Sequence, residues 1–266
     1  MSDDSHRCVA DLLFHGHKPD DPPAAFAPCH APAVMPGPEG DEVHVWQACG
    51  SRPPDSAGIA AILDDREMER YRRFHRPEDA GRYGFAHVTL RNVLASYLGT
   101  DPGALAFGHG PYGKPRMSII MGTDLRFNMA HSGDIVLIAI ARGREVGVDV
   151  ERVDASYPFM DTARSYFSEK EYALLLAAPA DQRPETFFTL WTRKEACIKA
   201  AGKGLHMPLS AVDLSGQGLN SDRQEVVVDG ARYTVAGLKP LPEYLGAVAV
   251  EGPLSAVRLR VWPGTR

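Results

Sequence analysis

The chain has 266 residues, of which 44% are hydrophobic and 24% are charged, and its net charge is −5. These values are ordinary for a water-soluble globular protein of one large or two small domains, and the mildly negative charge argues against a general nucleic-acid binder. No stretch reaches the roughly 20 consecutive apolar residues that a membrane span needs, so no membrane partner is expected.

The first 41 residues are rich in Pro, Ala, Asp and His and show no sustained period. We expect residues 1–41 to form a poorly ordered extension or a partly docked arm. They contain no basic region followed by an apolar stretch, which argues against a signal peptide. The four cysteines include no CxxC pair. A reduced, cytoplasmic protein is the simplest interpretation.

Order is predicted to begin with a short alternating strand over residues 43–46. Residues 59–74 favour one helix or two short helices, dense in arginine. Pro77, followed by acidic residues, is typical of a helix start, and Gly99 is expected to end that helix.

The middle of the chain begins with a turn-rich stretch over residues 108–115. A buried strand is predicted over residues 135–141. The turn at Arg142-Gly143-Arg144 is then expected to lead, as a hairpin, into a strand over residues 146–151.

The rest of the chain continues the mixture of helices and strands. Ser168 and Glu171 fit a capping box that opens a helix to about residue 178, and residues 183–201 predict a longer helix. Four further strands are expected, near residues 225–228, 232–236, 246–250 and 257–262. Helices and mostly antiparallel strands in both halves indicate the α+β class.

Two segments carry carboxylates in positions that restrict them. In the predicted strand over residues 146–151 the valines alternate, so Asp149 and Glu151 share the opposite face beside Gly147. In the predicted helix over residues 183–201, Glu195 and Lys199 are four residues apart and lie on one face. Alone, the strand carboxylates are more often solvated surface, and the helix pair is usually a surface ion pair worth about 0.3–0.5 kcal/mol. If strand and helix pack together, they outline a site for a divalent metal and a phosphate.

Residues suited to binding phosphate come earlier in the chain. Lys114 follows Gly113 in a tight turn. A lysine in such a turn is as often merely exposed to solvent as it is a phosphate contact. His131 and Ser132 directly precede the buried strand predicted over residues 135–141. A histidine in such a position is more often structural, but opposite lysines it can bind a phosphate oxygen.

Four spaced motifs together carry a family resemblance. They are Gly113-Lys114-Pro115, Phe127-Asn128-x-x-His131-Ser132, Gly147-x-Asp149-x-Glu151, and Trp191-x-x-Lys194-Glu195-Ala196-x-x-Lys199-Ala200-x-Gly202-x-Gly204. In this order they resemble the Sfp-type 4′-phosphopantetheinyl transferases, from about residue 43 through residue 209. The resemblance implies transfer of the phosphopantetheine arm of coenzyme A to a serine of an acyl- or peptidyl-carrier protein, releasing adenosine 3′,5′-bisphosphate.

The resemblance also implies roles for individual residues. Asp149, Glu151 and Glu195 would hold Mg²⁺, or Mn²⁺ in its place, together with the pyrophosphate of coenzyme A. Glu195 would take the proton of the carrier serine, directly or through water, and Lys199 would stabilise the leaving bisphosphate. Asp149, Glu195 and Lys199 are therefore the implied catalytic residues. The implied contacts to coenzyme A are Lys114 and His131 at the 3′-phosphate, with Ser132, Lys194, Lys199 and Arg82 elsewhere.

Some positions depart from the family pattern. Ala130 stands where relatives often have serine or threonine, which removes one hydroxyl contact to the nucleotide. His87 stands where some relatives have arginine. Arg70, Arg72 and Arg73 are interpreted as a solvated helix face.

The family likeness further implies two similar lobes that form a pseudo-dimer, with the active site in the cleft between them. We place the N-terminal lobe at residues 42–144, with the 3′-phosphate contacts, and the C-terminal lobe at residues 145–266, with the metal and catalytic residues. Since one chain supplies both lobes, a monomer is expected. The acidic carrier protein calls for a basic partner surface, expected over residues 164–199 and 204–208.

Two rival hypotheses belong to other functional classes. A coenzyme A-binding protein of the same fold could keep the nucleotide site without catalysing transfer. The complete set Asp149, Glu151, Glu195 and Lys199 argues against that rival. An unrelated α+β interaction protein would leave the clustering of the motifs unexplained.

Overall fold

The computed structural model describes residues 34–50, 55–216 and 221–262. The expected N-terminal extension over residues 1–41 therefore lies mostly outside the described residues. Its last part, from residue 34, packs on a long helix of the first half, where the backbone N–H of Met35 donates to the carbonyl of Ser96 at 2.9 Å. No helix in the described ranges is both long and apolar enough to cross a bilayer.

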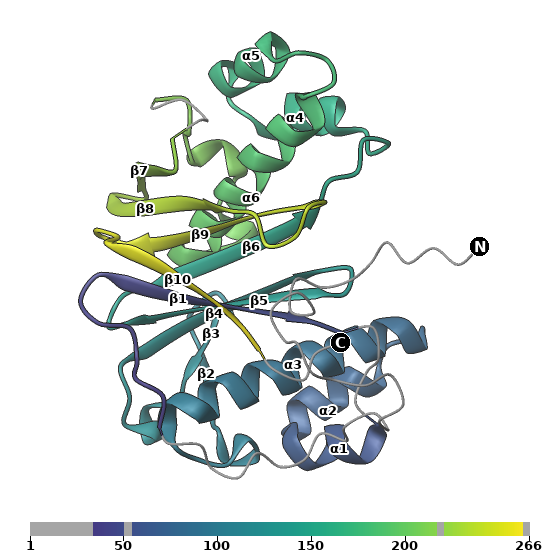
Figure 1. Cartoon of the computed structure of the whole chain (residues 1–266), viewed down its shortest axis with the longest axis vertical. Helices are drawn as coiled ribbons and strands as arrows, with labels where there is room; N and C mark the ends of the chain where they lie inside the picture. Colours follow the sequence, from purple (N-terminus) through teal and green to yellow (C-terminus); the bar gives the residue numbers. More distant parts are fainter. Residues whose placement is uncertain (1–33, 51–54, 217–220, 263–266) are drawn as a thin grey trace, which may run out of the picture.

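The fold is α+β, with two four-stranded sheets between helical layers (Figure 1). The first sheet has the strand order β10-β1-β5-β4 and the second has the order β6-β9-β8-β7. The strands of the first sheet are β1 (Glu42–Cys49), β4 (Leu125–Ser132), β5 (Ile135–Arg142) and β10 (Ala256–Val261). Those of the second are β6 (Val146–Arg152), β7 (Arg223–Val228), β8 (Ala231–Leu238) and β9 (Tyr244–Glu251). A separate hairpin pairs β2 (Phe107–His109) with β3 (Pro115–Met117).

The helices of the first half are α1 (Ser56–Ile62), α2 (Asp65–Arg72) and α3 (Pro77–Leu98). The arginine-rich segment therefore forms two short helices. Asp64 caps α2 in a capping box with Glu67, and Pro77 opens α3 at a position where its missing N–H costs nothing. Gly99, in the left-handed conformation with φ of 61°, ends α3 as the sequence predicts.

The helices of the second half are α4 (Phe159–Tyr166), α5 (Glu169–Ala177) and α6 (Arg183–Ala201). The predicted capping box of Ser168 and Glu171 is present at the start of α5. Short 3₁₀ turns, η2 (Pro102–Ala104), η3 (Ile119–Met121), η4 (Gly204–His206) and η5 (Leu209–Ala211), join the larger elements.

The two halves share one strand topology. In the first half β1 leads through helices to β4 and β5, and β5 pairs between the other two. In the second half β6 leads through helices to β8 and β9, and β9 pairs between β6 and β8. All four of these pairings are antiparallel. This repeated arrangement is consistent with two lobes, although no repeat is visible in the sequence.

Strand β6 does not form the predicted hairpin with β5. It pairs with β9 in the other sheet instead, and β5 pairs with β1 and β4. The reason is the burial of its valines: Val146, Val148 and Val150 are at most 1% exposed, in a core shared with Leu137 and other residues of the first sheet. The two sheets thus pack face to face, and the valines of β6 lie in the core between them.

The last strand, β10, belongs to the first sheet, so the chain does not divide into two lobes at residue 144 alone. Strand β10 pairs in parallel with β1, so residues 256–261 complete the first sheet although they follow the second one. The chain therefore crosses back between the lobes at its end, as Figure 1 shows.

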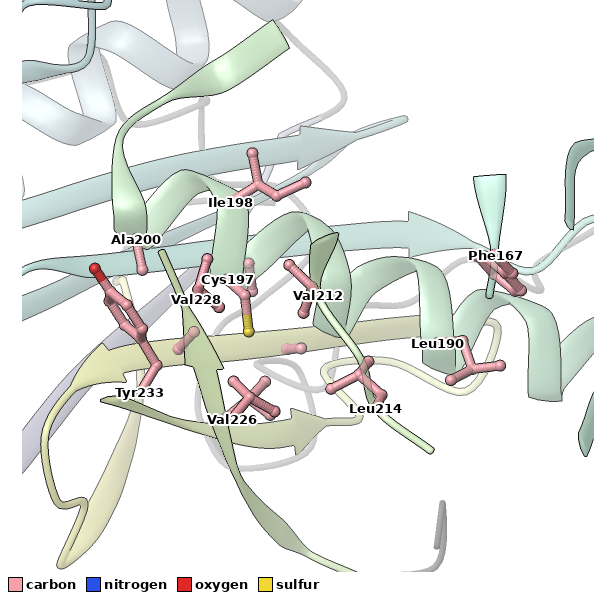
Figure 2. Close-up of a cluster of buried hydrophobic side chains, with 14 of the residues drawn as sticks. Phe167, Leu190, Cys197, Ile198, Ala200, Val212, Leu214, Val226, Val228 and Tyr233 are labelled. Atoms are coloured by element: carbon pink, nitrogen blue, oxygen red, sulfur yellow. The ribbon is translucent and has the colours of Figure 1, made fainter. Parts of the chain in front are cut away.

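Each sheet also has a helix-covered face. Helix α3 packs on the first sheet through residues such as Leu94, against Ile138. Helix α6 packs on the second sheet, where Leu190 and Cys197 lie among Val226, Val228 and neighbouring side chains (Figure 2). The result is four layers, helix on sheet on sheet on helix.

Candidate active site

Strand β6 and helix α6 touch through their backbones at Gly147. A Cβ atom there would clash with the backbone of Ala196, Lys199 and Ala200. Glycine is therefore required at this position by the close approach of the helix, not by its own backbone angles. The contact brings the side chains that follow Gly147 on β6 next to those of α6.

The ammonium of Lys199 lies 2.6 Å from Oδ1 of Asp149. Asp149 is 4% exposed, and its other oxygen, Oδ2, is buried without a hydrogen-bond partner. Burial raises the pKa of Asp149, and the positive charge of Lys199 opposes that rise. A buried carboxylate oxygen without a partner is energetically costly, so it marks a place where a cation would be stabilised.

The negative charge of Asp149 also acts on two other carboxylates, Glu151 and Glu195. Burial, with the repulsion of Asp149, raises the pKa of Glu151 to about 7. Burial and the same repulsion raise the pKa of Glu195. Asp149 is therefore close enough to Glu151 and Glu195 to shift the pKa of both. This proximity follows from the packing of β6 on α6. A divalent cation would relieve the repulsion among the three carboxylates.

The three carboxylates are not closed into a coordination shell. Among the described residues no group of three His, Cys, Asp or Glu side chains is close enough together to hold a metal ion. The residues nevertheless fit a hard cation such as Mg²⁺, because all offer oxygen atoms and Oδ2 of Asp149 has no other partner.

Strands β4 and β6 are connected by hydrogen bonds that involve side chains of β4, and not by backbone hydrogen bonds between paired strands. Oδ1 of Asn128 accepts a hydrogen bond from the backbone N–H of Val148 at 2.9 Å. Ser132 accepts from the backbone N–H of Arg152 at 3.1 Å and donates to Oε2 of Glu151 at 3.2 Å. Ser132 lies at the end of β4, and its hydroxyl is used to orient Glu151.

His131 and Arg82 lie at the same end of β4. His131 lies at the protein surface. Its pKa is nevertheless lowered, because neighbouring residues partly enclose it and because Lys199 and Arg82 are positively charged. Arg82 is held loosely, 3.7 Å from Asp134 and 3.4 Å from Asp79. Of the cations predicted for coenzyme A, His131, Arg82 and Lys199 thus lie close enough together for Arg82 and Lys199 to affect His131.

A groove of about 790 Å³ opens on the first lobe, lined by α2, α3 and β4. Its basic lining includes Arg66 and Arg70 of α2, Arg73 directly after α2 and His87 of α3, and Asn128 of β4 also lines it. Arg70, Arg72 and Arg73 are all exposed, as the sequence interpretation of a solvated face expects, and Arg70 and Arg73 also line this groove. Residues 66, 70 and 73 fall on one side of a helix, so their side chains can line the groove together.

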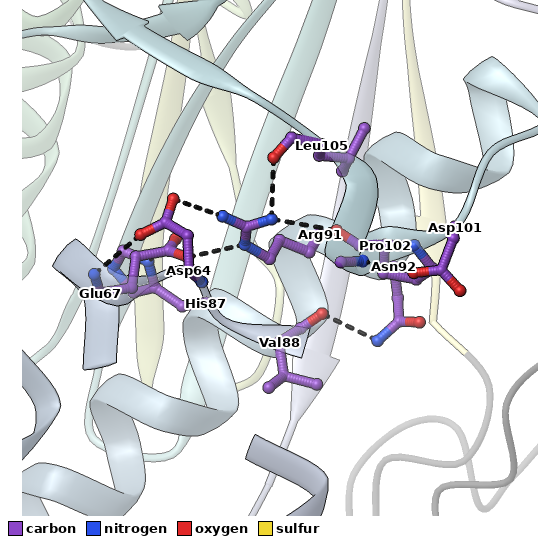
Figure 3. A network of polar contacts seen from close by, with 10 residues as sticks. Asp64, Glu67, His87, Val88, Arg91, Asn92, Asp101, Pro102 and Leu105 are labelled. Carbon is purple, nitrogen blue, oxygen red and sulfur yellow. Dashed lines mark hydrogen bonds and ion pairs between the residues drawn. The ribbon is translucent and has the colours of Figure 1, made fainter. Parts of the chain in front are cut away.

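A buried arginine holds α2 in place beside this groove (Figure 3). Arg91 has no exposed side-chain surface, and it contacts Asp64 and Glu67 at 2.7 Å each. Nδ1 of His87 lies 2.8 Å from Oε1 of the same Glu67. His87, which departs from the family pattern, is therefore part of the network that fixes the arginine-bearing helix.

Two of the lysines expected to contact coenzyme A are engaged inside the protein. Lys194 has no exposed side-chain surface, and its ammonium lies 2.7 Å from both carboxylate oxygens of Glu171 and also contacts the carbonyl of Val212. It stabilises the second lobe, with no atom at the surface for a phosphate. The Lys114 ammonium donates to Glu145, Val146 and Ala200.

The chain is similar to known proteins over much of its length. Residues 145–237 match the model of the 4′-phosphopantetheinyl transferase superfamily. The chain is 31% identical over 214 residues to the 4′-phosphopantetheinyl transferase HetI of Nostoc sp., covering 80% of this chain and 89% of the relative. It is 36% identical over 162 residues to a 4′-phosphopantetheinyl transferase of Bacillus subtilis, covering 59% and 70%. The match to the 4′-phosphopantetheinyl transferase Sfp of Bacillus subtilis strain 168 is 33% over 151 residues, covering 57% and 65%.

Proposed function

Because this chain belongs to the 4′-phosphopantetheinyl transferase superfamily, we propose that the junction of β6 and α6 is its active site. The enzyme transfers the 4′-phosphopantetheine group of coenzyme A to a carrier protein. The observation that carries the site assignment is the buried Asp149, which is paired with Lys199 through one oxygen and has the other oxygen free beside two carboxylates of raised pKa.

Asp149, Glu151 and Glu195 would hold Mg²⁺, or Mn²⁺ in its place. When bound, the metal neutralises charge on the pyrophosphate of coenzyme A. Ser132 keeps Glu151 oriented through its hydroxyl hydrogen bond. Lys199 is 31% exposed on its side chain, so its ammonium is able to reach a phosphate oxygen while it remains near Asp149.

The nucleotide end of coenzyme A is assigned to the first lobe. His131 and Arg82 supply donors at the end of β4, and the groove beside α2 adds three arginines. Arginine binds phosphate in a bidentate manner, and aromatic side chains in the groove, such as Tyr83 and Phe107, suit an adenine ring. His131 is the residue we place at the 3′-phosphate.

Glu195 is placed as the general base for the carrier serine. Its carboxylate is half-buried, and the raised pKa makes it a stronger base than a solvated glutamate. It takes the proton of the serine hydroxyl, directly or through water, while the serine oxygen attacks the β-phosphorus. The bond to the bridging oxygen then breaks, and adenosine 3′,5′-bisphosphate leaves with the negative charge beside Lys199.

The carrier protein is proposed to approach over α4, the start of α5 and the middle of α6. Arg164 of α4 and Lys170 of α5 are exposed, and Tyr166 is 49% exposed beside Trp191, one turn before Glu195. Basic and aromatic side chains suit an acidic carrier. Both walls of the site come from one chain, so the enzyme is proposed to act as a monomer, with lobes near residues 42–144 and 145–266 joined by β10.

The direct test is intact-mass measurement of an apo carrier protein after incubation with the enzyme, coenzyme A and Mg²⁺. Wild-type enzyme should add one phosphopantetheine group per carrier serine, and Asp149→Asn should add none in the same time. Coenzyme A binding without any mass shift, across acyl and peptidyl carriers, would favour the non-catalytic coenzyme A-binding protein instead.

A further inference from the structure

Lys114 occupies a position that the transfer reaction does not by itself explain. It follows the turn between β2 and β3 in the first lobe, but its ammonium enters the second lobe. It lies 2.6 Å from Oε2 of Glu145 and donates to the carbonyls of Val146 at 3.0 Å and Ala200 at 2.9 Å. An ammonium group has three N–H donors, so these contacts use all of them.

The three acceptors lie on the two elements that cross at Gly147. Glu145 directly precedes β6, Val146 is its first residue, and Ala200 belongs to the last turn of α6. The stem of Lys114 also packs on the end of that helix, with its Cδ 3.1 Å from the Cβ position of Gly202. A cation at the C-terminus of a helix is stabilised by the helix dipole and satisfies an otherwise unpaired carbonyl.

The surroundings of Lys114 disfavour a phosphate as its partner. Its side chain is only 10% exposed. The carboxylate of Glu145 lies directly beside the ammonium and would repel an incoming anion. A phosphate would also have to replace two backbone carbonyls, which would then be left without their hydrogen bonds.

We propose that Lys114 is a positioning residue, which ties the first lobe to the crossing of β6 and α6 and thereby fixes Lys199 relative to Asp149. Lys199 directly precedes Ala200, one of the acceptors, and Asp149 follows Val146 on β6. The assignment rests on the proposed function of this junction. It replaces the 3′-phosphate contact that the sequence implied for Lys114.

The experiment compares coenzyme A with 3′-dephospho-coenzyme A as donor, with kcat and KM measured well below the unfolding temperature. Lys114→Met keeps the apolar stem and removes the three hydrogen bonds. Glu145→Gln is a second variant that leaves the lysine in place, in case Lys114→Met does not fold. His131→Ala serves as the reference for loss of a 3′-phosphate contact.

If Lys114 is a positioning residue, Lys114→Met lowers kcat at least about tenfold with both donors, because small displacements of reacting groups are costly. The preference for coenzyme A over the dephospho donor stays within about twofold of wild type. Glu145→Gln changes kcat in the same direction but less, and the double variant is no worse than Lys114→Met alone.

Two results would overturn the assignment. Selective loss of the preference for coenzyme A in Lys114→Met, as in His131→Ala, would make Lys114 a phosphate contact. A lower unfolding temperature with unchanged kcat per folded molecule would make it only a structural link. If His131→Ala leaves the donor preference intact, the 3′-phosphate assignment of His131 fails separately, and the Lys114 comparison still stands on its equal effect on both donors.

Discussion

The Lys199 ammonium and Oδ1 of Asp149 are 2.6 Å apart, and this ion pair joins helix α6 to strand β6 beside the point where their backbones touch. The pair places Lys199, the cation proposed to bind phosphate, next to a buried carboxylate that has one oxygen still unpartnered. Glu195 lies one helical turn before Lys199 on the same side of α6. Metal binding, proton removal and stabilisation of the leaving group are therefore assigned to a single helix–strand contact.

Replacement of Glu195 by glutamine should lower kcat far more than it weakens coenzyme A binding. The change removes the base and one metal-ligand charge, both of which are needed chiefly in the transition state. We expect kcat to fall by about 100-fold or more, with the Kd for coenzyme A, measured by calorimetry, within about threefold of wild type. Equal losses in both, or no loss in either, would show that Glu195 has a different role.

Replacement of Gly147 by alanine should separate α6 from β6. The new methyl group would meet backbone atoms of Ala196, Lys199 and Ala200, which are not free to move like a flexible side chain. We expect a loss of about 2 kcal/mol or more in the free energy of unfolding, as for other overpacked positions, with loss of transfer activity. Gly216→Ala is the matched control, since nothing lies within 4 Å of its Cβ position. A Gly147→Ala enzyme with wild-type stability and activity would contradict the close-contact account.

Metal affinity should depend on pH through Glu151. Its pKa in the free protein is raised from 4.5 to about 7, so below that pH it carries a proton that must leave before it binds a metal. In the presence of coenzyme A, the apparent affinity for Mg²⁺ should therefore fall as the pH drops through about 7. Calorimetric titrations at several pH values measure this. The same slope in Glu151→Gln would assign the titration to another group.

Acid should weaken the first lobe through His44. This histidine is 2% exposed, and its Nδ1 and the hydroxyl oxygen of Tyr97 form a buried hydrogen bond of 2.7 Å. Burial and the charge of Arg260 lower its pKa from 6.5 to about 4. Because the folded pKa lies below the unfolded one, the contribution of His44 is fully present above pH 6.5 and is lost as the pH falls through about 4.

Denaturant unfolding between pH 7 and pH 4 tests this expectation. The lost contribution is on the order of 3 kcal/mol for a shift of this size. His44→Gln keeps a hydrogen-bonding group without a titratable ring, so its stability should depend less on pH over that range. An identical pH dependence in the two proteins would exclude His44 as the responsible group.

The sequence predicted the local elements well where the signals were local. The capping box of Ser168, the start of α3 at Pro77 and the alternation of valines in β6 each depend on a few neighbouring residues, and each is present. The same alternation placed Asp149 and Glu151 on the face toward α6. The site residues that the motifs brought together are therefore those fixed by the period of a strand or a helix.

The long-range features could not be derived in that way. The predicted β5–β6 hairpin was wrong because the valines of β6 are buried against another sheet, which no local turn signal reveals. The parallel pairing of β10 with β1 joins residues more than 200 positions apart. Lys194 adjoins Glu195 in the chain, but adjacent residues of a helix do not share a face, and its ammonium pairs with Glu171 of a different helix. Such partners are visible only when the tertiary packing is known.

The central claim is that Asp149, Glu151 and Glu195 bind the catalytic metal together with coenzyme A. The most direct measurement is a crystal structure of the enzyme soaked with coenzyme A and Mn²⁺, read for its anomalous scattering. The account predicts one strong Mn²⁺ peak contacted by Oδ2 of Asp149 and by the pyrophosphate, with the nucleotide end on the first lobe near His131. A metal peak elsewhere with coenzyme A bound, or coenzyme A bound away from the β6–α6 junction, would contradict it.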